Sequence, residues 1–547
     1  MTSSKPLRFL GAANLIFTIT LSIGLSLVAY SLLILLMPTQ LGVDQYWCMY
    51  AAKQMLGGVQ LDGPRLVETN PPLYVWFSLV PAELAGITKL SFTFAYELIS
   101  TIVALAGCYL AIDIEWRIVG NTKRLFFVCL AVCTVVTELF LLQRRPGEIS
   151  STMTNFGQKE YFVVVLLLPY VLGVLGDILP TMTNGRRILI GFFAGLAICL
   201  KPHQVLVVLL VQVAVLVWNK RLTGLVTIEN GSLIATSAAY IPLIVLFSPS
   251  YMPQILPMML DTYWAMGTHS AWFLFAHQNV HHFELLATAL VICVALRKHM
   301  KTPRCSFGLL VCSLGSSLAY DLQHTGWAYQ QLPAWAFLIL ATLWMASDLT
   351  CTWVVKHGIR VRVSRAVVGL LVVAGTASLL YNARRLTVQK DRSLSTVSTI
   401  AKELLPCPPG TSVYLISVSM PPFKVILDQN LVWGSRFAHL WMVPALTLNE
   451  EAHREPGRPF KSMSPTTRLQ LTRDLQSAIV ADIASWKPKL IFVARADNAL
   501  PAGANALDWL RQNSAFDAEW ENYSKVKTVA NADGSVREAY DEYVRID

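Results

Sequence analysis

The apolar stretch Leu10 to Met37, LGAANLIFTITLSIGLSLVAYSLLILLM, decides the fold class. It is longer than the ~20 residues that cross the hydrocarbon core of a bilayer. It is also too long for the apolar region of a signal peptide and poor in small-residue cleavage sites, so we expect a retained membrane anchor. Asp44 follows within a few positions, in a loop that contains Tyr46 and Trp47. Aromatic residues favour the layer where headgroups meet water, which predicts an acidic side chain at the membrane edge.

Ten further apolar runs predict a polytopic α-helical membrane protein of about eleven spans. The composition agrees, since 54% of the residues are hydrophobic, 14% are charged and the mean hydropathy is +0.49. The ten runs are Leu90 to Ile112, Leu125 to Leu142, Tyr161 to Leu179, Ile188 to Leu200, Gln204 to Trp218, Ser232 to Phe247, Phe283 to Leu296, Ser306 to Tyr320, Ala334 to Met345 and Ala366 to Tyr381.

The basic residues give the expected orientation. The formal net charge is +10, and seventeen Lys and Arg fall in the amino-terminal segment and every second loop after it, from Lys5 to Arg365. The positive-inside rule places these segments in the cytoplasm, so the basic balance points to a membrane and not to nucleic acid. An odd number of spans then puts the tail outside. We therefore expect a multi-pass protein of the inner (plasma) membrane with a periplasmic carboxy-terminal region.

The tail has the higher charge density and the short β-type runs of a soluble domain. This divides the chain into a membrane module, residues 1–383, and an α/β domain, residues 384–547. Its expected strands are Ser412 to Val418, Leu490 to Val493, Lys525 to Val529 and Tyr543 to Ile546. Its expected helices are Ser464 to Trp486 and Ala504 to Gln512. About 160 residues are enough to bury a core. This domain is expected to cover the membrane module or to bind an acceptor.

The outer loops carry the unusual polar residues. In the first, Glu68 and Asn70 precede Pro71-Pro72, which restrict the backbone and favour the start of a helix. Asp44 is either a working carboxylate or a solvated loop acid.

The second outer loop holds Arg144, Arg145 and Glu148, and it returns through Gln158-Lys159-Glu160. Two arginines on the base-poor side match phosphate oxygens, or else they extend to lipid headgroups.

Two further outer turns add candidate ligands. Lys201-Pro202-His203 lies in a very short turn, where its ammonium meets a lipid phosphate or anchors the helix at the bilayer surface. His324, Trp327, Tyr329 and Gln331 offer the hydrogen bonds and aromatic faces of a sugar or headgroup site.

Other polar groups favour less specific interpretations. The loop from Ser248 to His282 has four histidines, whose spacing matches no compact zinc motif and suits an interfacial helix. Glu97 is an intramembrane acid and a functional candidate on that ground. Most of the ten cysteines lie in apolar runs, where they act as small hydrophobes.

Together these features resemble the GT-C membrane glycosyltransferases, the superfamily of the lipid A aminoarabinose transferase and the protein O-mannosyltransferases. The resemblance rests on Asp44 after the first span, on Asn70-Pro71-Pro72-Leu73, on Gly157-Gln158-Lys159-Glu160, on Lys201-Pro202-His203, and on many spans followed by an outer domain. It covers about the first 335 residues.

The resemblance implies transfer of a sugar from a polyprenyl phosphate to a glycolipid, polysaccharide or protein outside the membrane, usually with inversion. The implied catalytic residues are Asp44 as general base with Glu160 or Glu148 as a second acid. The implied phosphate-binding residues are Arg144, Arg145, Lys201 and His203. The implied sugar or acceptor residues are Glu68, Asn70, Gln158, Lys159, His324, Trp327, Tyr329 and Gln331. The second loop lacks an Asp-x-Asp pair, so no cofactor is predicted, although some members use a divalent cation such as Mg²⁺, Mn²⁺ or Zn²⁺.

Two other classes compete with the enzyme. A transporter or flippase of lipid-linked substrates needs charges through the mid-membrane and often two related halves, which are not evident here. A sensor or assembly protein would act through its outer domain and would not need Asp44, Arg144, Arg145 and Lys201 to converge.

Overall fold

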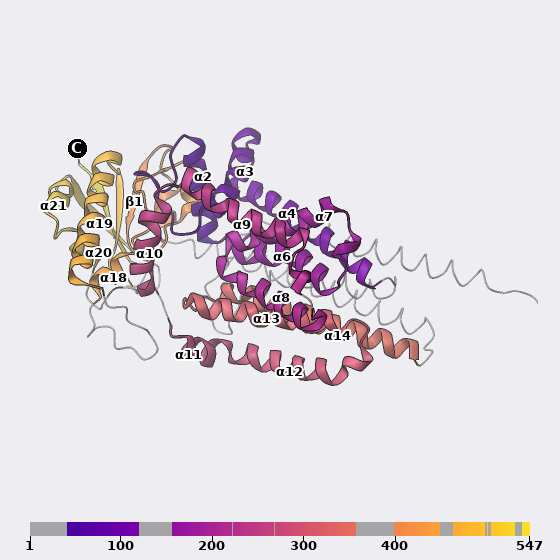
Figure 1. Ribbon diagram of the computed structural model, residues 1–547. Helices are drawn as coiled ribbons and strands as arrows, with labels where there is room; N and C mark the ends of the chain where they lie inside the picture. Colours follow the sequence, from indigo (N-terminus) through magenta and orange to yellow (C-terminus); the bar gives the residue numbers. More distant parts are fainter. Residues whose placement is uncertain are drawn as a thin grey trace, which may run out of the picture.

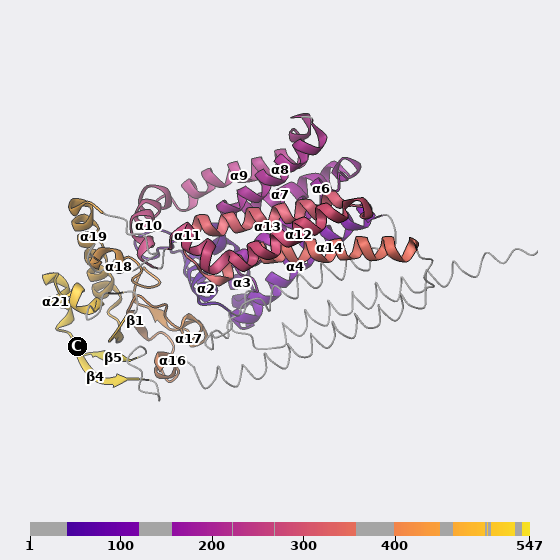
Figure 2. The same cartoon turned by 90° about the horizontal axis from the view of Figure 1, so that it is seen from below.

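The computed structural model describes residues 41–119, 156–220, 222–266, 269–356, 399–448, 463–497, 500, 505–530 and 539–546. Figure 1 shows a bundle of helices with a mixed α/β domain at one end, and Figure 2 shows the same arrangement after a quarter turn. The bundle contains α2 (Val43–Leu56), α3 (Leu73–Thr88), α4 (Phe92–Val119), α6 (Lys159–Leu175), α7 (Asn184–Leu200), α8 (Val205–Asn219), α9 (Ile228–Phe247), α11 (Ala271–Phe273), α12 (Val280–Leu296), α13 (Pro303–Gln323) and α14 (Leu332–Lys356). The short helix α10 (Leu256–Thr262) lies beside the α/β domain.

The predicted spans correspond to helices wherever the structure describes them. Eight predicted runs fall on α4, α6, α7, α8, α9, α12, α13 and α14. Among the described residues, five helical segments are long and apolar enough to cross a membrane: Phe92–Glu115, Pro202–Asn219, Ile228–Phe247, Ala271–His299 and Pro303–Gln323. The runs Leu10 to Met37, Leu125 to Leu142 and Ala366 to Tyr381 lie outside the described residues. The chain is a multi-pass membrane protein.

Helices α2 and α3 lie at the end of the bundle nearest the α/β domain in both views. Pro72 is the residue before α3, which confirms that the paired prolines start a helix. The sequence did not predict that this helix runs on to Thr88. It also placed Lys159 and Glu160 in a loop, whereas both lie in the first turn of α6.

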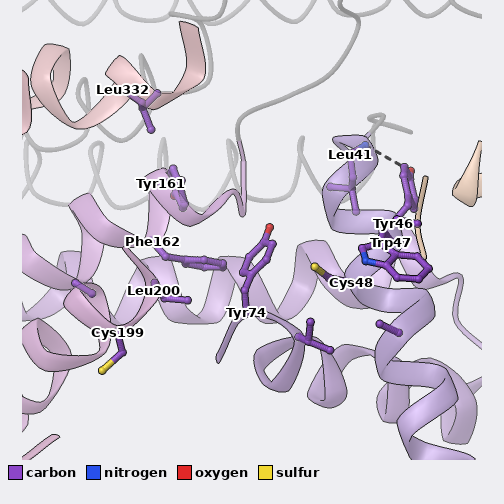
Figure 3. Packing of buried hydrophobic residues seen from close by; sticks show 14 of the residues in the cluster. Leu41, Tyr46, Trp47, Cys48, Tyr74, Tyr161, Phe162, Cys199, Leu200 and Leu332 are labelled. Carbon is purple, nitrogen blue, oxygen red and sulfur yellow. Dashed lines mark hydrogen bonds between the residues drawn. The ribbon is translucent and has the colours of Figure 1, made fainter. Parts of the chain in front are cut away.

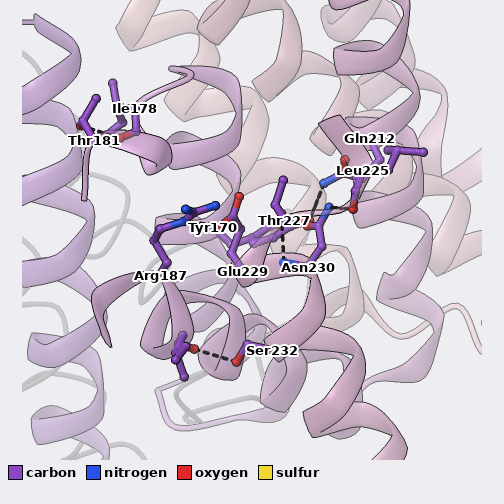
Figure 4. Close-up of polar contacts among 11 residues, drawn as sticks. Tyr170, Ile178, Thr181, Arg187, Gln212, Leu225, Thr227, Glu229, Asn230 and Ser232 are labelled. Carbon is purple, nitrogen blue, oxygen red and sulfur yellow. Dashed lines mark hydrogen bonds and ion pairs between the residues drawn. The ribbon is translucent and has the colours of Figure 1, made fainter. Parts of the chain in front are cut away.

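Small residues allow the central helices to approach closely. Gly191 and Gly195 of α7 lie one turn apart, and a Cβ at Gly191 would be 2.2 Å from the carbonyl oxygen of Glu229 in α9. This is the small-xxx-small packing that stabilises helix pairs in membranes. At the same end of α7, Arg187 pairs with Glu229, and Tyr170 bonds Asn230 at 2.6 Å (Figure 4).

The carboxy-terminal domain is built on a five-stranded sheet of order β2-β1-β3-β5-β4. Strand β1 (Ser412–Ile416) pairs in parallel with β2 (Val432–Trp433) and β3 (Leu490–Ala494), whereas β5 (Tyr540–Arg545) is antiparallel to β3 and to β4 (Tyr523–Val529). The helices are α16 (Thr399–Leu404), α17 (Phe423–Asp428), α18 (Val443–Thr447), α19 (Pro465–Trp486), α20 (Ala506–Leu510) and α21 (Ser514–Trp520).

The strand sequences fit their positions. Strands β1 and β3 are apolar and almost wholly buried, as expected of parallel strands covered on both faces. The edge strand β4 carries Lys525 and Lys527 on a largely exposed stretch, which protects an edge against pairing with other chains. The expected strands and both helices of the tail are confirmed within a few residues.

The α/β domain is joined by hydrogen bonds to α2 and to the segment between α2 and α3. Val67 N donates to Arg436 O at 2.8 Å, and the backbone NH of Trp433 donates to the hydroxyl of Tyr50 at 2.9 Å. Phe423 packs on Trp47 of α2 with ring centroids 4.8 Å apart. One continuous cluster of buried apolar side chains therefore extends from the bundle into the domain.

Candidate functional site

Asp44 lies at the amino terminus of α2, one residue into the helix. Gly42 is the N-cap, and its backbone NH donates to Oε1 of Gln45. A carboxylate in the first turn interacts favourably with the helix dipole. Asp44 is half-buried, and within the described part of the chain its carboxylate makes no hydrogen bond or ion pair. This acid is available for chemistry.

Charged and aromatic groups from four other segments lie within electrostatic reach of Asp44. Burial lowers the pKa of Lys201, and the neighbouring carboxylates of Glu160 and Asp44 oppose that shift. Burial also raises the pKa values of Tyr263 and Tyr329, and the Asp44 charge adds to both shifts. These groups come from the start of α6, from the residue that follows α7, from η5 (Tyr263–Met266) and from η8 (Ala328–Gln331).

The ammonium of Lys201 is held by two partners. It forms an ion pair with Oε1 of Glu160 at 2.8 Å and donates to Oε1 of Gln323 at 3.1 Å. Pro202 follows Lys201, which favours the non-helical backbone between α7 and α8. Glu160 is 2% exposed and its second oxygen has no hydrogen-bond partner among the described residues. The pair leaves an acceptor position at Glu160 open.

A chain of hydrogen bonds runs from the first loop to α6. Oε1 of Glu68 accepts from the backbone NH of Asn70 at 2.7 Å and from its side-chain amide at 2.6 Å, and Oε2 accepts from Trp47 Nε1. The side-chain carbonyl oxygen of Asn70 then accepts from Lys159 Nζ, whose ammonium lies 5.2 Å from the ring centroid of Tyr74. Glu68 is buried, with 2% of its surface exposed. It is linked to the site by the hydrogen bonds through Asn70 and Lys159.

The substitution Glu68→Gln tests this arrangement. The new amide keeps one acceptor for Asn70 but sets its NH₂ against the Trp47 indole NH, which leaves a buried donor without an acceptor. We expect a loss of stability of roughly 1–3 kcal/mol. Thermal unfolding in detergent measures it, with the exposed Glu83→Gln as the control. An unchanged melting temperature would mean that this bond is not formed.

The turn before α6 is fixed by a glycine. Gly157 has φ +70°, and a Cβ there would lie 2.7 Å from the Tyr96 ring. The hydroxyls of Tyr74 and Tyr96 lie 2.9 and 2.7 Å from the carbonyl oxygen of Gly157. Gln158, the N-cap of α6, donates to Gln45 at 3.3 Å. Figure 3 shows Tyr74 among the buried residues that support this end of the bundle.

Four aromatic residues in contact connect the bundle to the α/β domain. Tyr263 lies 6.1 Å from Trp327 and 5.7 Å from Trp441, measured between ring centroids. Trp327 stacks on Tyr329 at 5.9 Å. Tyr263 and Trp327 are each half-buried, so they retain surface for a ligand.

His324 and Gln331 belong to a neighbouring polar cluster. His324 Nδ1 lies 3.0 Å from His269 O, and Gln331 donates to Oδ1 of Asn279 at 2.8 Å. His282 is buried elsewhere, between Ser313 and Ser317. Within the described ranges no three His, Cys, Asp or Glu side chains are grouped as metal ligands would be.

The remaining predicted site residues are placed as follows. His203 is half-buried and lies close enough to Lys201 to be affected by its charge. Arg144, Arg145 and Glu148 lie outside the described residues. The structure therefore brings together Asp44, Lys159, Glu160 and Lys201, with Tyr329 beside them.

Asp62 is a buried acid under the first loop that the sequence did not single out. It is 4% exposed, and Oδ1 accepts from the backbone NH of Glu68 at 3.0 Å. Burial raises its pKa to about 7, the Glu68 NH bond opposes the shift, and the Glu68 charge adds to it. Its φ of 58° is one that Asp and Asn tolerate better than most residues.

Asp62→Asn is expected to stabilise the protein in a pH-dependent way. The unfolded chain loses this proton near pH 4 and the folded chain near pH 7, so the wild type loses stability as pH rises between these values. Asn keeps the acceptor and never ionises. We expect a gain of roughly 1–3 kcal/mol at pH 8 that disappears at pH 4. Melting curves at both values check it, and an equal difference at both would contradict the assignment.

Besides Asp62, two residues near Asp44 were not predicted from the sequence. Tyr263 lies in the loop from Ser248 to His282, and the sequence predicted no site role for it. His439, in the soluble domain, carries no motif, and only the docking of that domain places it near Asp44.

These features define a class of fold: the chain has the architecture of the GT-C membrane glycosyltransferases. One solved structure that it resembles is ArnT from Cupriavidus metallidurans bound to undecaprenyl phosphate, with a TM-score of 0.53 and 13% sequence identity. The similarity covers 96% of this chain and 97% of ArnT, so it includes the α/β domain, which the sequence motifs alone do not relate to the family. No protein-family model and no curated protein sequence matches the chain.

Proposed function

We propose that this protein is a glycosyltransferase that moves a sugar from a polyprenyl-phosphate donor to an acceptor outside the membrane, with inversion. The observation that carries the proposal is the Asp44 carboxylate, which has no hydrogen-bond or ion-pair partner among the described residues and lies within electrostatic reach of the Lys201–Glu160 pair in an ArnT-like fold. The undecaprenyl phosphate in the ArnT structure supports the choice of donor.

The chemistry requires a base and a stabilised leaving group. The acceptor hydroxyl attacks the anomeric carbon, the new C–O bond forms, and the bond to the phosphate oxygen breaks with its electron pair on the polyprenyl phosphate. Asp44 takes the hydroxyl proton. Lys201, with Arg144, Arg145 and His203 as further proposed ligands, binds the phosphate and stabilises its charge.

The other acids and the aromatic residues take supporting roles. Glu160 holds the Lys201 ammonium in place and offers its second oxygen to the acceptor, a role for which Glu148 is the alternative. Glu68 positions Asn70 and Lys159 by the hydrogen bonds described above. Trp327 and Tyr329 supply an aromatic face for a sugar, with Gln158, His324 and Gln331 at its margin.

The proposed location follows from the charge pattern. The amino terminus lies in the cytoplasm and the α/β domain in the periplasm, so the site opens at the outer surface of the inner membrane. No metal is part of the proposed reaction.

The direct test is an assay of the purified chain in lipid nanodiscs. Undecaprenyl phosphates carrying glucose, mannose, galactose, arabinose or 4-aminoarabinose are offered with lipid A, a soluble oligosaccharide or a Ser/Thr peptide. We expect one donor to release undecaprenyl phosphate with formation of a glycosylated acceptor of opposite anomeric configuration. Binding of undecaprenyl phosphate without turnover on any pair would argue against the enzyme and favour a carrier.

A further inference from the structure

The loops that follow β1 and β2 include His439, which lies within electrostatic reach of Asp44. Leu440 N donates to Ser417 O at 3.0 Å, which ties the two loops together. Asp497 fixes the first loop, since its Oδ2 accepts from Val418 N at 2.7 Å and from Ser417 Oγ at 3.0 Å. Carboxyl ends of parallel strands are where α/β sheets bind ligands, and here that edge is held by these bonds.

His439 projects from the second of these loops in a defined tautomer. Its Nδ1 lies 2.6 Å from the carbonyl oxygen of Val418. A carbonyl only accepts, so Nδ1 carries the proton in the neutral ring. Burial lowers the pKa of His439 to about 4, against the opposing effects of the Val418 bond and the Asp44 charge. At neutral pH, Nε2 therefore presents a lone pair, and among the described residues it has no hydrogen-bond partner.

The ring lies at the meeting point of the two modules. The Asp44 carboxylate of the bundle is near enough to His439 for its charge to act on the pKa of the imidazole. Two positions further on, Trp441 contacts the ring of Tyr263, which is itself within reach of the Asp44 charge. Lys201 and Glu160, by contrast, come from the bundle. Asp44 is therefore near charged residues of the bundle, Lys201 and Glu160, and also near His439 of the soluble domain.

We infer that His439 is an acceptor-positioning residue, whose Nε2 accepts a hydrogen bond from a second hydroxyl of the acceptor while Asp44 faces the hydroxyl that attacks. An acceptor bound in this way carries neighbouring hydroxyls, so it is a sugar. The inference rests on the proposed function, and it adds the soluble domain to the site. The half-buried rings of Tyr263 and Trp327 fit the apolar face of such an acceptor.

Two substitutions of His439 distinguish the role of Nδ1 from that of Nε2. In His439→Asn the amide reaches about as far as Nδ1 and keeps the bond to Val418, but Nε2 is lost. In His439→Gln the amide reaches about as far as Nε2 and replaces the acceptor. His277→Asn is the matched control, because its Nδ1 also lies against a carbonyl, that of Phe273, on an exposed turn.

The readout is steady-state transfer in nanodiscs with the donors and acceptors given above, together with undecaprenyl phosphate binding and melting temperature. We expect His439→Asn to raise the acceptor KM roughly three- to tenfold, the loss of one neutral hydrogen bond. The donor KM, undecaprenyl phosphate binding and melting temperature stay as in wild type, and His439→Gln recovers part of the loss. Lipid A and the oligosaccharide distinguish a glycolipid from a free glycan.

The outcomes are distinct. An active wild type with an unchanged acceptor KM in His439→Asn overturns the inference and leaves the proposed function standing. The inference is also overturned if only the melting temperature changes, or if the Ser/Thr peptide is the acceptor. A wild type that transfers none of the sugars overturns the proposed function, and the inference with it.

Discussion

Asp44→Asn is expected to lower sugar transfer by a factor of roughly 10²–10⁴, the contribution typical of a general base. Asn has nearly the same size and keeps a hydrogen-bonding oxygen, but it cannot take the proton of the acceptor. Asp44 makes no hydrogen bond or ion pair within the described residues, so the substitution removes only the interaction of its charge with the α2 dipole, worth about 0.3–1 kcal/mol. The melting temperature should therefore fall only slightly, and undecaprenyl phosphate binding should match the wild type.

The control for Asp44→Asn is Glu83→Gln, which neutralises an exposed acid in α3. It should retain full transfer. Normal transfer by Asp44→Asn would refute the assignment of the base, whereas a loss of stability well above ~1 kcal/mol would assign Asp44 a structural role.

Lys201→Met is expected to affect both stability and turnover. It leaves Glu160 buried without its partner, and breaking a buried ion pair costs roughly 3–5 kcal/mol. It also removes a cation from the proposed phosphate site, so undecaprenyl phosphate binding should weaken about tenfold or more. The double variant Lys201→Met with Glu160→Gln removes both charges, and we expect it to regain most of the stability but none of the turnover.

A matched ion pair at the other end of α7 provides the control. Arg187 and Glu229 are 2.8 Å apart with side chains 14% and 5% exposed, and Lys201 and Glu160 are 2.8 Å apart with side chains 14% and 3% exposed. Arg187→Met should lose similar stability while the donor KM and undecaprenyl phosphate binding stay unchanged. If the two lysine variants bind undecaprenyl phosphate as the wild type does, Lys201 is a structural residue only.

The sequence predicted the fold where the physical signal is local. Strands β1 and β3 are continuous apolar runs, and α19 has helical periodicity over 22 residues. Strand β2 has two residues, too few for any pattern, and it forms because its neighbour β1 offers free backbone groups. The resemblance anticipated the GT-C architecture, which the comparison with ArnT confirms.

The candidate site could be predicted only in part. The sequence singled out Asp44, Glu160 and Lys201 because they are charged residues in predicted loops on the base-poor side of the membrane. Their proximity depends on how α2, α6 and α7 pack, and more than 100 residues separate the first of them from the second. The ion pair between Glu160 and Lys201 and the approach of His439 arise from that packing, which no local pattern encodes.

The backbone bond between Val67 and Arg436 also bears on how such proteins can be engineered. A hydrogen bond between main chains holds the domain to the loop regardless of side chains, and Tyr50 adds a second attachment at Trp433. Deleting the tail would strip these groups of their partners in the segment that leads to Glu68 and Asn70. Chimeras that exchange the α/β domain between homologues should therefore carry the segment between α2 and α3 along with it.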